Sequence, residues 1–158
     1  MSSVMSPAMS TEEAVVERWV ELTLNSYPAE TLSFLSGEQD AFRNPVGQTL
    51  RKSLAALVHE VLGAMDNGRM LEALDALVRM RAVQNFSPAD AVRFVFALRA
   101  AIREATGAVP ESLHSRVDEL ALMTFDQYMS CREQIFQLRV NELRSRMHYA
   151  LASEEEEE

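Results

Sequence analysis

Apolar side chains recur along this chain at spacings of three and four residues, the spacing of one face of an α-helix. Runs of β-branched residues are few, and only five glycines and five prolines are present, which favours helices over a sheet. We therefore expect an all-α fold of about six helices, a helical bundle with a long C-terminal helix. The expected helices span about residues 11–25, 29–35, 45–62, 70–83, 88–107 and 110–151.

Two of these helices begin with residues that can satisfy unpaired backbone N–H groups. Ser10 and Glu13 have the spacing of a capping box. Ser87 is an N-cap candidate, and Pro88 at the first helical position has no N–H to leave unpaired. Asp90 adds a negative charge at the positive end of the helix dipole. We expect helices to start at both places.

Two interior elements are predicted from their composition. Asp66-Asn67-Gly68 has the residues of a tight turn, which would separate the third and fourth helices. The fifth helix is apolar around most of its circumference, as expected for a central core helix. Its large apolar residues are Val92, Phe94, Val95, Phe96, Leu98 and Ile102.

The last predicted helix carries two apolar stripes and, after Pro110 at its start, no glycine or proline. One stripe contains Leu113, Val117, Leu120, Thr124, Tyr128, Cys131, Ile135 and Leu138. The other contains Leu122, Phe125, Met129, Phe136, Val140, Leu143 and Met147. A helix of about 40 residues is about 60 Å long, which exceeds the width of a domain of this size.

We therefore expect the outer half of this helix to project and to pair with a second copy of the chain. The surface expected to transmit a signal lies near residues 134–147. A charged residue in place of Leu138 or Leu143 should convert the dimer to a monomer. The full candidate surface for a partner or a second copy is Tyr128, Arg132, Ile135, Leu138, Arg139, Glu142 and Leu143.

Length and composition indicate one soluble domain over residues 11–151, after a disordered stretch at 1–10 and before an acidic tail at 152–158. The formal charge is −9, but five of these charges come from Glu154–Glu158, and no basic stripe favours nucleic acid. No apolar run is long enough to insert into a membrane, and no secretory signal begins the chain. The single cysteine, Cys131, excludes an intrachain disulfide. A cytoplasmic location is expected.

No sequence motif indicates catalysis, a metal or a cofactor, so we expect a non-enzyme. The three histidines lie on separate predicted helices. His59 could face the core or a pocket; it is a weak candidate for a cofactor ligand, and the expected alternative is a structural histidine whose ring is satisfied. Cys131 is expected to be a small buried hydrophobe. Glu60 is expected on a solvated helix face.

Polar residues near the helix junctions leave two interpretations open. Arg81, Gln84, Asn85 and Arg93 surround the start of the fifth helix, where they could form ion pairs and cap bonds or line a small polar pocket. Trp19 and Phe42 are expected to be core or lid residues.

Several blocks together resemble the N-terminal domain of RsbRD-type proteins, the RsbT co-antagonists of bacterial stress signalling. The Ala82–Pro88 block, AVQNFSP, with the helix behind it is the most specific. The other matching blocks are Arg18-Trp19, Ser26–Pro28, Phe42–Gly47, Phe125–Met129, Cys131–Glu133 and Arg139–Glu142. The similarity covers about residues 12–146.

The resemblance implies a sensory or regulatory domain with a globin-like fold that holds no haem and dimerises through a long C-terminal helix. Full-length relatives continue into a STAS domain, which this chain lacks, so we expect a standalone version that signals by binding another protein. Two alternatives stay open. One is a sensor of a small molecule or haem, with a pocket near His59. The other is an accessory subunit or regulator of a metabolic or redox complex.

Overall fold

A computed structural model describes residues 8–27 and 45–156 of the chain. These residues form helices and no strands, which confirms the all-α prediction. The described part holds five helices, one fewer than expected, and the short helix expected at 29–35 lies outside it, as does Phe42. The helices are α1 (Thr11–Leu24), α3 (Pro45–Leu62), α4 (Asn67–Val83), α5 (Pro88–Thr106) and α6 (Glu111–Glu156).

Both predicted helix starts are confirmed. The Glu13 backbone N–H donates to Ser10 Oγ at 3.1 Å, and the Ser10 N–H donates to Glu13 Oε2 at 2.8 Å, which completes the capping box. At α5 the Asp90 N–H donates to Ser87 Oγ at 3.1 Å, and Pro88 is the first helical residue. These starts are set by local chemistry, which is why the sequence reveals them.

The tight turn predicted at residues 66–68 is wrong. Asp66 is instead the N-cap of α4, because its Oδ1 accepts the Arg69 N–H at 2.9 Å. The chain reverses just before it, where Met65 has a φ of 55°. Glu60 is buried there and accepts the Asp66 N–H at 3.0 Å, so the expectation of a solvated Glu60 is also wrong.

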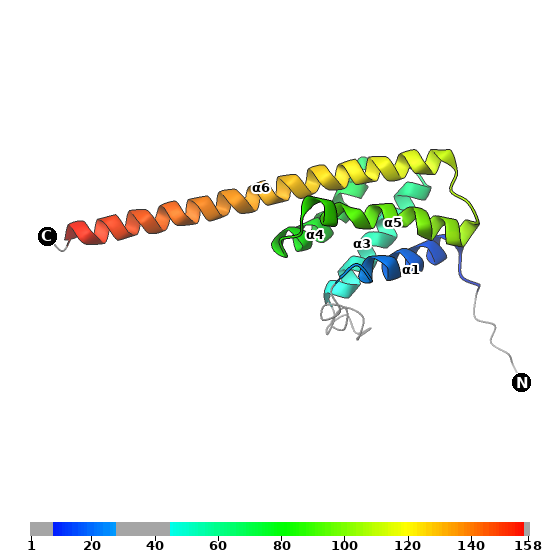
Figure 1. Cartoon of the computed structure of the whole chain (residues 1–158), viewed down its shortest axis with the longest axis horizontal. Coiled ribbons are helices and arrows are strands. Elements are labelled where there is room, and N and C mark those ends of the chain that lie inside the picture. Colours follow the sequence, from blue (N-terminus) through cyan, green and yellow to red (C-terminus); the bar gives the residue numbers. More distant parts are fainter. Residues whose placement is uncertain (1–7, 28–44, 157–158) are drawn as a thin grey trace, which may run out of the picture.

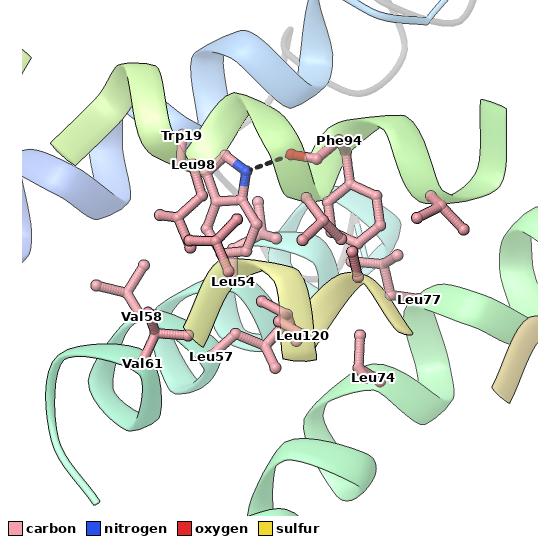
Figure 2. Close-up of a cluster of buried hydrophobic side chains, with 14 of the residues drawn as sticks. Trp19, Leu54, Leu57, Val58, Val61, Leu74, Leu77, Phe94, Leu98 and Leu120 are labelled. Atoms are coloured by element: carbon pink, nitrogen blue, oxygen red, sulfur yellow. Dashed lines mark hydrogen bonds between the residues drawn. The ribbon is translucent and has the colours of Figure 1, made fainter. Parts of the chain in front are cut away.

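The helices pack around one apolar core (Figure 1). α1 lies against α5 and α3, α3 packs on α4, and α6 crosses both α4 and α5. Trp19 is at the centre, with its indole stacked on the Phe94 ring at 5.8 Å between ring centres (Figure 2). Its indole N–H donates to the Phe94 carbonyl at 2.7 Å, so the one polar atom of the ring is satisfied. Trp19 is therefore the core residue that the sequence predicts.

A smaller part of the circumference of α5 is buried than expected. Val92, Phe94 and Leu98 are buried, but Phe96 is 46% exposed. The prediction that α5 is enclosed on most sides is wrong, because α1 and α6 cover it and leave a face open to solvent.

α6 extends well beyond the other helices of the domain (Figure 1). Its 46 residues give it a length of about 70 Å. Cys131 is its last buried residue, as predicted for a small hydrophobe, and Ile135 is half-buried against the core. From Phe136 onward Val140 alone is partly covered among the side chains described, and Leu138 is exposed. In the described ranges, none of the helices is apolar enough over a sufficient length to cross a membrane.

Candidate functional site

The turn between α4 and α5 is the point where three helices meet. α4 ends with Gln84 at its C-cap, and Asn85 adopts a left-handed φ of 58°, a conformation that asparagine tolerates better than most residues. The Phe86 N–H then donates to the Arg81 carbonyl at 3.2 Å. This geometry turns the chain sharply, and the Phe86 carbonyl is left available to accept hydrogen bonds from α6.

Two side chains of α6 donate to the Phe86 carbonyl. One is the hydroxyl of Tyr128, and the other is Nη1 of Arg132 at 3.4 Å. Tyr128 is fully buried, so its expected place on an exposed partner surface is wrong. The two bonds tie α6 to the turn within one helical turn of Cys131, just before the helix leaves the body.

Arg81 is the largest charged side chain in the core, and it is only 1% exposed. Three aromatic rings surround its guanidinium carbon, at 4.5 Å from the ring centre of Phe94, 5.1 Å from Phe86 and 5.2 Å from Tyr27. Cation–π attraction to these rings offsets part of the cost of burial. Burial nevertheless lowers the pKa of the Arg81 guanidinium from its ordinary value, but an arginine stays charged at neutral pH.

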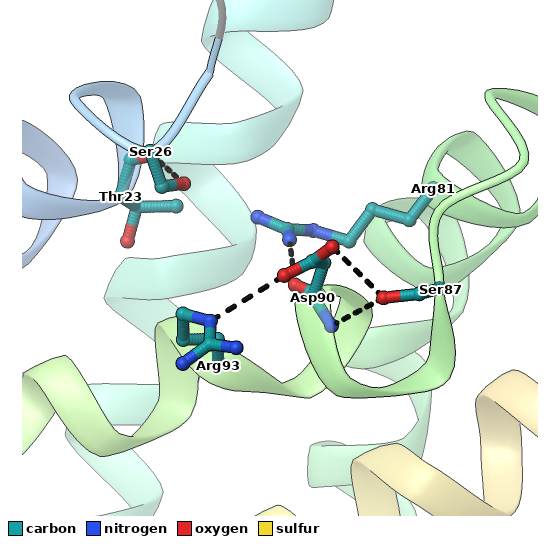
Figure 3. A network of polar contacts seen from close by, with 6 residues as sticks. All are labelled: Thr23, Ser26, Arg81, Ser87, Asp90 and Arg93. Carbon is teal, nitrogen blue, oxygen red and sulfur yellow. Dashed lines mark hydrogen bonds and ion pairs between the residues drawn. The ribbon is translucent and has the colours of Figure 1, made fainter.

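Asp90 links Arg81 to the start of α5 (Figure 3). Nη1 of Arg81 donates to the Asp90 carbonyl at 3.1 Å. The Asp90 carboxylate bonds elsewhere, since it accepts the Ser87 hydroxyl at 2.8 Å and lies 3.4 Å from Nε of Arg93. The Ser87 hydroxyl, followed by Arg93, holds the pKa of the Asp90 carboxyl below its usual value. Of the residues predicted at the polar junction, Arg81 and Arg93 therefore both bind Asp90.

Asn85 belongs to a different feature, an open groove of about 850 Å³ between the end of α4 and α6. The groove joins Asn85 to residues of the predicted partner surface on α6. Its lining residues are Ala82, Asn85, Asp126, Met129, Ser130, Arg132, Glu133, Ile135, Phe136 and Arg139. Both charge signs and several apolar side chains are present, as on surfaces that bind proteins.

An apolar stripe that shares Met129 and Phe136 with this groove runs along the open side of α6. Leu122, Phe125, Met129, Phe136, Leu143 and Met147 are exposed, and Val140 is partly covered. The stripe is about 38 Å long, from Leu122 over the body to Met147 on the projecting part. It is the second of the two stripes that the sequence predicts. Exposed apolar patches of this extent mark interaction sites.

The remaining candidates lie apart from these features. Gln84 and Arg93 are exposed, Leu138 lies on another face of α6, and Glu142 pairs with Arg146 at 2.6 Å. His59 does not face the core. It is exposed, with Nδ1 3.0 Å from Glu12 Oε1, and it lines an open pocket of about 630 Å³ between α3 and α4, which is the second of the two places that the sequence leaves open for it. The described residues contain no group of three or more histidine, cysteine or acidic side chains that could hold a metal ion.

The aromatic surround of Arg81 was not foreseen, although the sequence contains a signal for its burial. Leu74, Leu77, Val78 and Arg81 are spaced three, four and seven residues from the first, so Arg81 falls on the buried face of α4. Because arginine is charged, it is ordinarily assigned to an exposed position, and the periodic signal is easily overlooked. Nothing local to Arg81 indicates that Tyr27, in the segment after α1, and Phe94, in α5, cover it.

Comparison with known proteins gives one family match and one relative over most of the chain. The family described as RsbT co-antagonist protein rsbRD N-terminal domain matches residues 13–143. An uncharacterized protein of Archaeoglobus fulgidus is 31% identical over 136 residues, which cover 81% of this chain and 82% of the relative. No solved structure gives a significant match.

Proposed function

The chain belongs to the family of the rsbRD N-terminal domain of RsbT co-antagonist proteins, and on this basis we propose that it is a non-enzymatic regulatory or adaptor domain of stress-type signalling. It acts by binding proteins, and its first partner is a second copy of itself. The exposed apolar stripe on α6 carries this proposal.

The projecting part of α6 needs a partner on energetic grounds. Phe136, Leu143 and Met147 are between 60% and 65% exposed. Full burial of such a side chain is worth about 1.5–3 kcal/mol, so a surface that covers several of them recovers a substantial free energy. A helix of about 20 residues without tertiary contacts is also only marginally stable in water. Pairing would supply both the burial and the support.

The spacing of the stripe supports a second copy as the occupant. Leu122, Met129, Phe136 and Leu143 are seven residues apart, the repeat of a left-handed coiled coil. Val140 and Met147 each follow four residues after a member of this series, which places them on the adjacent core positions. A two-fold axis along α6 would lay one stripe against the other.

The contact between α6 and the α4–α5 turn suggests how a signal would reach the paired α6 helices. Tyr128 and Arg132 hold α6 to the Phe86 carbonyl where the helix leaves the body. A shift of the turn therefore changes the direction or rotation of α6, and with it the geometry of the dimer. The groove lined by Arg132 and Arg139 lies beside the stripe, so a protein bound there would sense the same change.

The test replaces Leu143 by glutamate, which places a charge in the projecting part of the stripe. We expect Leu143→Glu to be a monomer by light scattering, while the parent chain is a dimer. Gln134→Glu is the matched control, because it adds the same charge to the opposite side of the same helix, which is also exposed. Circular dichroism establishes that both variants keep their helices.

A dimeric Leu143→Glu variant would remove the stripe as the pairing surface. A Gln134→Glu variant that also becomes monomeric would show that added charge alone disrupts pairing. A monomeric parent chain would exclude the second copy as partner.

A further inference from the structure

The open pocket between α3 and α4 is lined by two polar side chains that are almost fully buried. Ser53 is 7% exposed and Glu60 is 4% exposed, and both come from α3. The Ser53 hydroxyl makes no hydrogen bond within the described ranges. Buried polar groups are nearly always paired in folded proteins, so a hydroxyl left free at a pocket wall points to a bond with a ligand. The volume of about 630 Å³ suits a small molecule.

Glu60 also has bonding capacity left over. Its Oε2 accepts the Asp66 N–H at 3.0 Å. Its Oε1 lies 3.6 Å from Nη1 of Arg69, an ion pair that is too long for a hydrogen bond. A buried carboxylate is costly unless its oxygens accept bonds, so a donor that reached Oε1 through the pocket would be stabilised.

The charges that line this pocket are of both signs. Lys52 and Arg69 are positive, whereas Glu60 and Glu72 are negative. Arg69 is already paired with Glu60, but Lys52, next to Ser53 in the chain, forms no ion pair with any residue that the structure describes. One end of the pocket therefore offers a free cation and a hydroxyl, and the other offers a carboxylate oxygen.

From this arrangement we infer that the pocket binds a small zwitterion, with an ammonium at one end and a carboxylate at the other. The ammonium donates to Oε1 of Glu60. The carboxylate accepts the Ser53 hydroxyl and pairs with Lys52, and bonds of this kind to charged groups are about twice as strong as neutral ones. A ligand with a charge of one sign would leave either Lys52 or Glu60 unmatched.

The lining between these two ends is made of small side chains. Ser53 and Glu60 are seven residues apart, about 10 Å along the axis of α3, so the ligand needs several carbon atoms between its charges. Ala56 lies between them on the same face of α3, and Ala73 and Ala76 line the pocket from α4. These methyl groups leave room for an aliphatic chain and contact it favourably.

The experiment uses 6-aminohexanoate as the probe with the full chain, and two-dimensional NMR follows the backbone amides. Hexanoate and hexylamine, which each carry one of its two charges, are the comparison compounds. We expect saturable shifts in α3 and α4, with an affinity for 6-aminohexanoate at least about tenfold above that for either comparison compound. Equal or weaker affinity than a comparison compound would overturn the assignment to a zwitterion. Absence of saturable shifts in α3 and α4 would overturn the site.

Two variants assign the ends of the ligand. Lys52→Met should bind 6-aminohexanoate no more tightly than the parent binds hexylamine. Glu60→Gln keeps an oxygen for the Asp66 N–H and should bind it no more tightly than the parent binds hexanoate. Arg51→Met is the matched control, because it removes the same charge from an exposed residue of α3 that does not line the pocket, and it should bind as the parent does.

Ser53→Ala tests the hydroxyl and should weaken binding about tenfold, the effect of one lost bond to a charged group. Circular dichroism establishes which variants are folded, and Lys52→Met, changed at an exposed residue, keeps the inference testable if Glu60→Gln is not. Parent-like affinity in Lys52→Met or in Ser53→Ala would contradict the inference.

This inference does not rest on the pairing of α6, because the residues that line the pocket come from α3 and α4. Leu143→Glu should therefore bind 6-aminohexanoate as the parent does, whether or not the parent is a dimer. Loss of binding in that variant would contradict a site formed by α3 and α4 alone.

Discussion

At the scale of single residues, Arg81 has the environment least expected for its type. Its position on the apolar face of α4 puts a cation where its neighbours in the pattern are leucine and valine. The long aliphatic stem and the three surrounding rings make that position possible. Charge and periodicity conflict here, and periodicity decides where the side chain lies.

Tyr27, which covers this cation, gives a prediction for alkaline pH. Burial raises the pKa of its phenol above the ordinary 10.0, and Arg81 opposes the shift. Because the folded pKa exceeds the unfolded one, the contribution of the neutral phenol is complete below about pH 10 and is lost as the pH rises through the folded pKa. In urea unfolding between about pH 9 and pH 11.5, Tyr27→Phe should lose less stability than the parent. Parallel losses in the two proteins would contradict the shift.

At the scale of elements, helix starts follow from local sequence and helix burial does not. The caps at Ser10 and Ser87 depend on residues within one turn, so they were predicted correctly. The wrong turn at residues 66–68 arose because asparagine and glycine there begin a helix that Asp66 caps. The exposure of Phe96 depends on which helices cover α5, and that is decided by tertiary packing.

The N-cap of α5 provides a test at this scale. Ser87→Ala removes the acceptor of the Asp90 N–H and should lower the free energy of unfolding by about 1 kcal/mol. The pKa of the Asp90 carboxyl should rise toward its usual value, since the Ser87 hydroxyl is the chief cause of its depression. Urea unfolding and a carboxyl titration by NMR measure the two effects. Ser115→Ala, in the exposed face of α6, is the control, and equal effects in both variants would argue against the cap.

The same division applies to the candidate site. Arg132, Ile135 and Arg139, which the sequence assigns to a partner surface, line the groove on α6, and their binding of a partner stays a prediction. The prediction that Tyr128 lies on the exposed partner surface is wrong, because its hydroxyl donates to the Phe86 carbonyl, 42 residues away in sequence. Contacts between distant segments carry no local signature, and they determine most of the junction.

At the scale of the whole molecule, the two halves of α6 have different surroundings. Its first half completes the core of the domain, and its second half extends beyond the other helices (Figure 1). The apolar stripe runs across both halves, whereas the buried stripe ends near Cys131 and Ile135. The continuous stripe is the surface on which we expect the second copy to lie.

Disulfide cross-linking tests this most directly, because it reports which face of α6 pairs. Leu143 and Leu138 are both exposed, but they are about 140° apart around the helix. Under mild oxidation we expect Leu143→Cys to form a covalent dimer and Leu138→Cys to remain a single chain. The parent, whose Cys131 is buried, is the reference. Pairing through the apolar stripe would be contradicted if Leu138→Cys formed the covalent dimer and Leu143→Cys did not. It would also be contradicted if neither variant formed a covalent dimer.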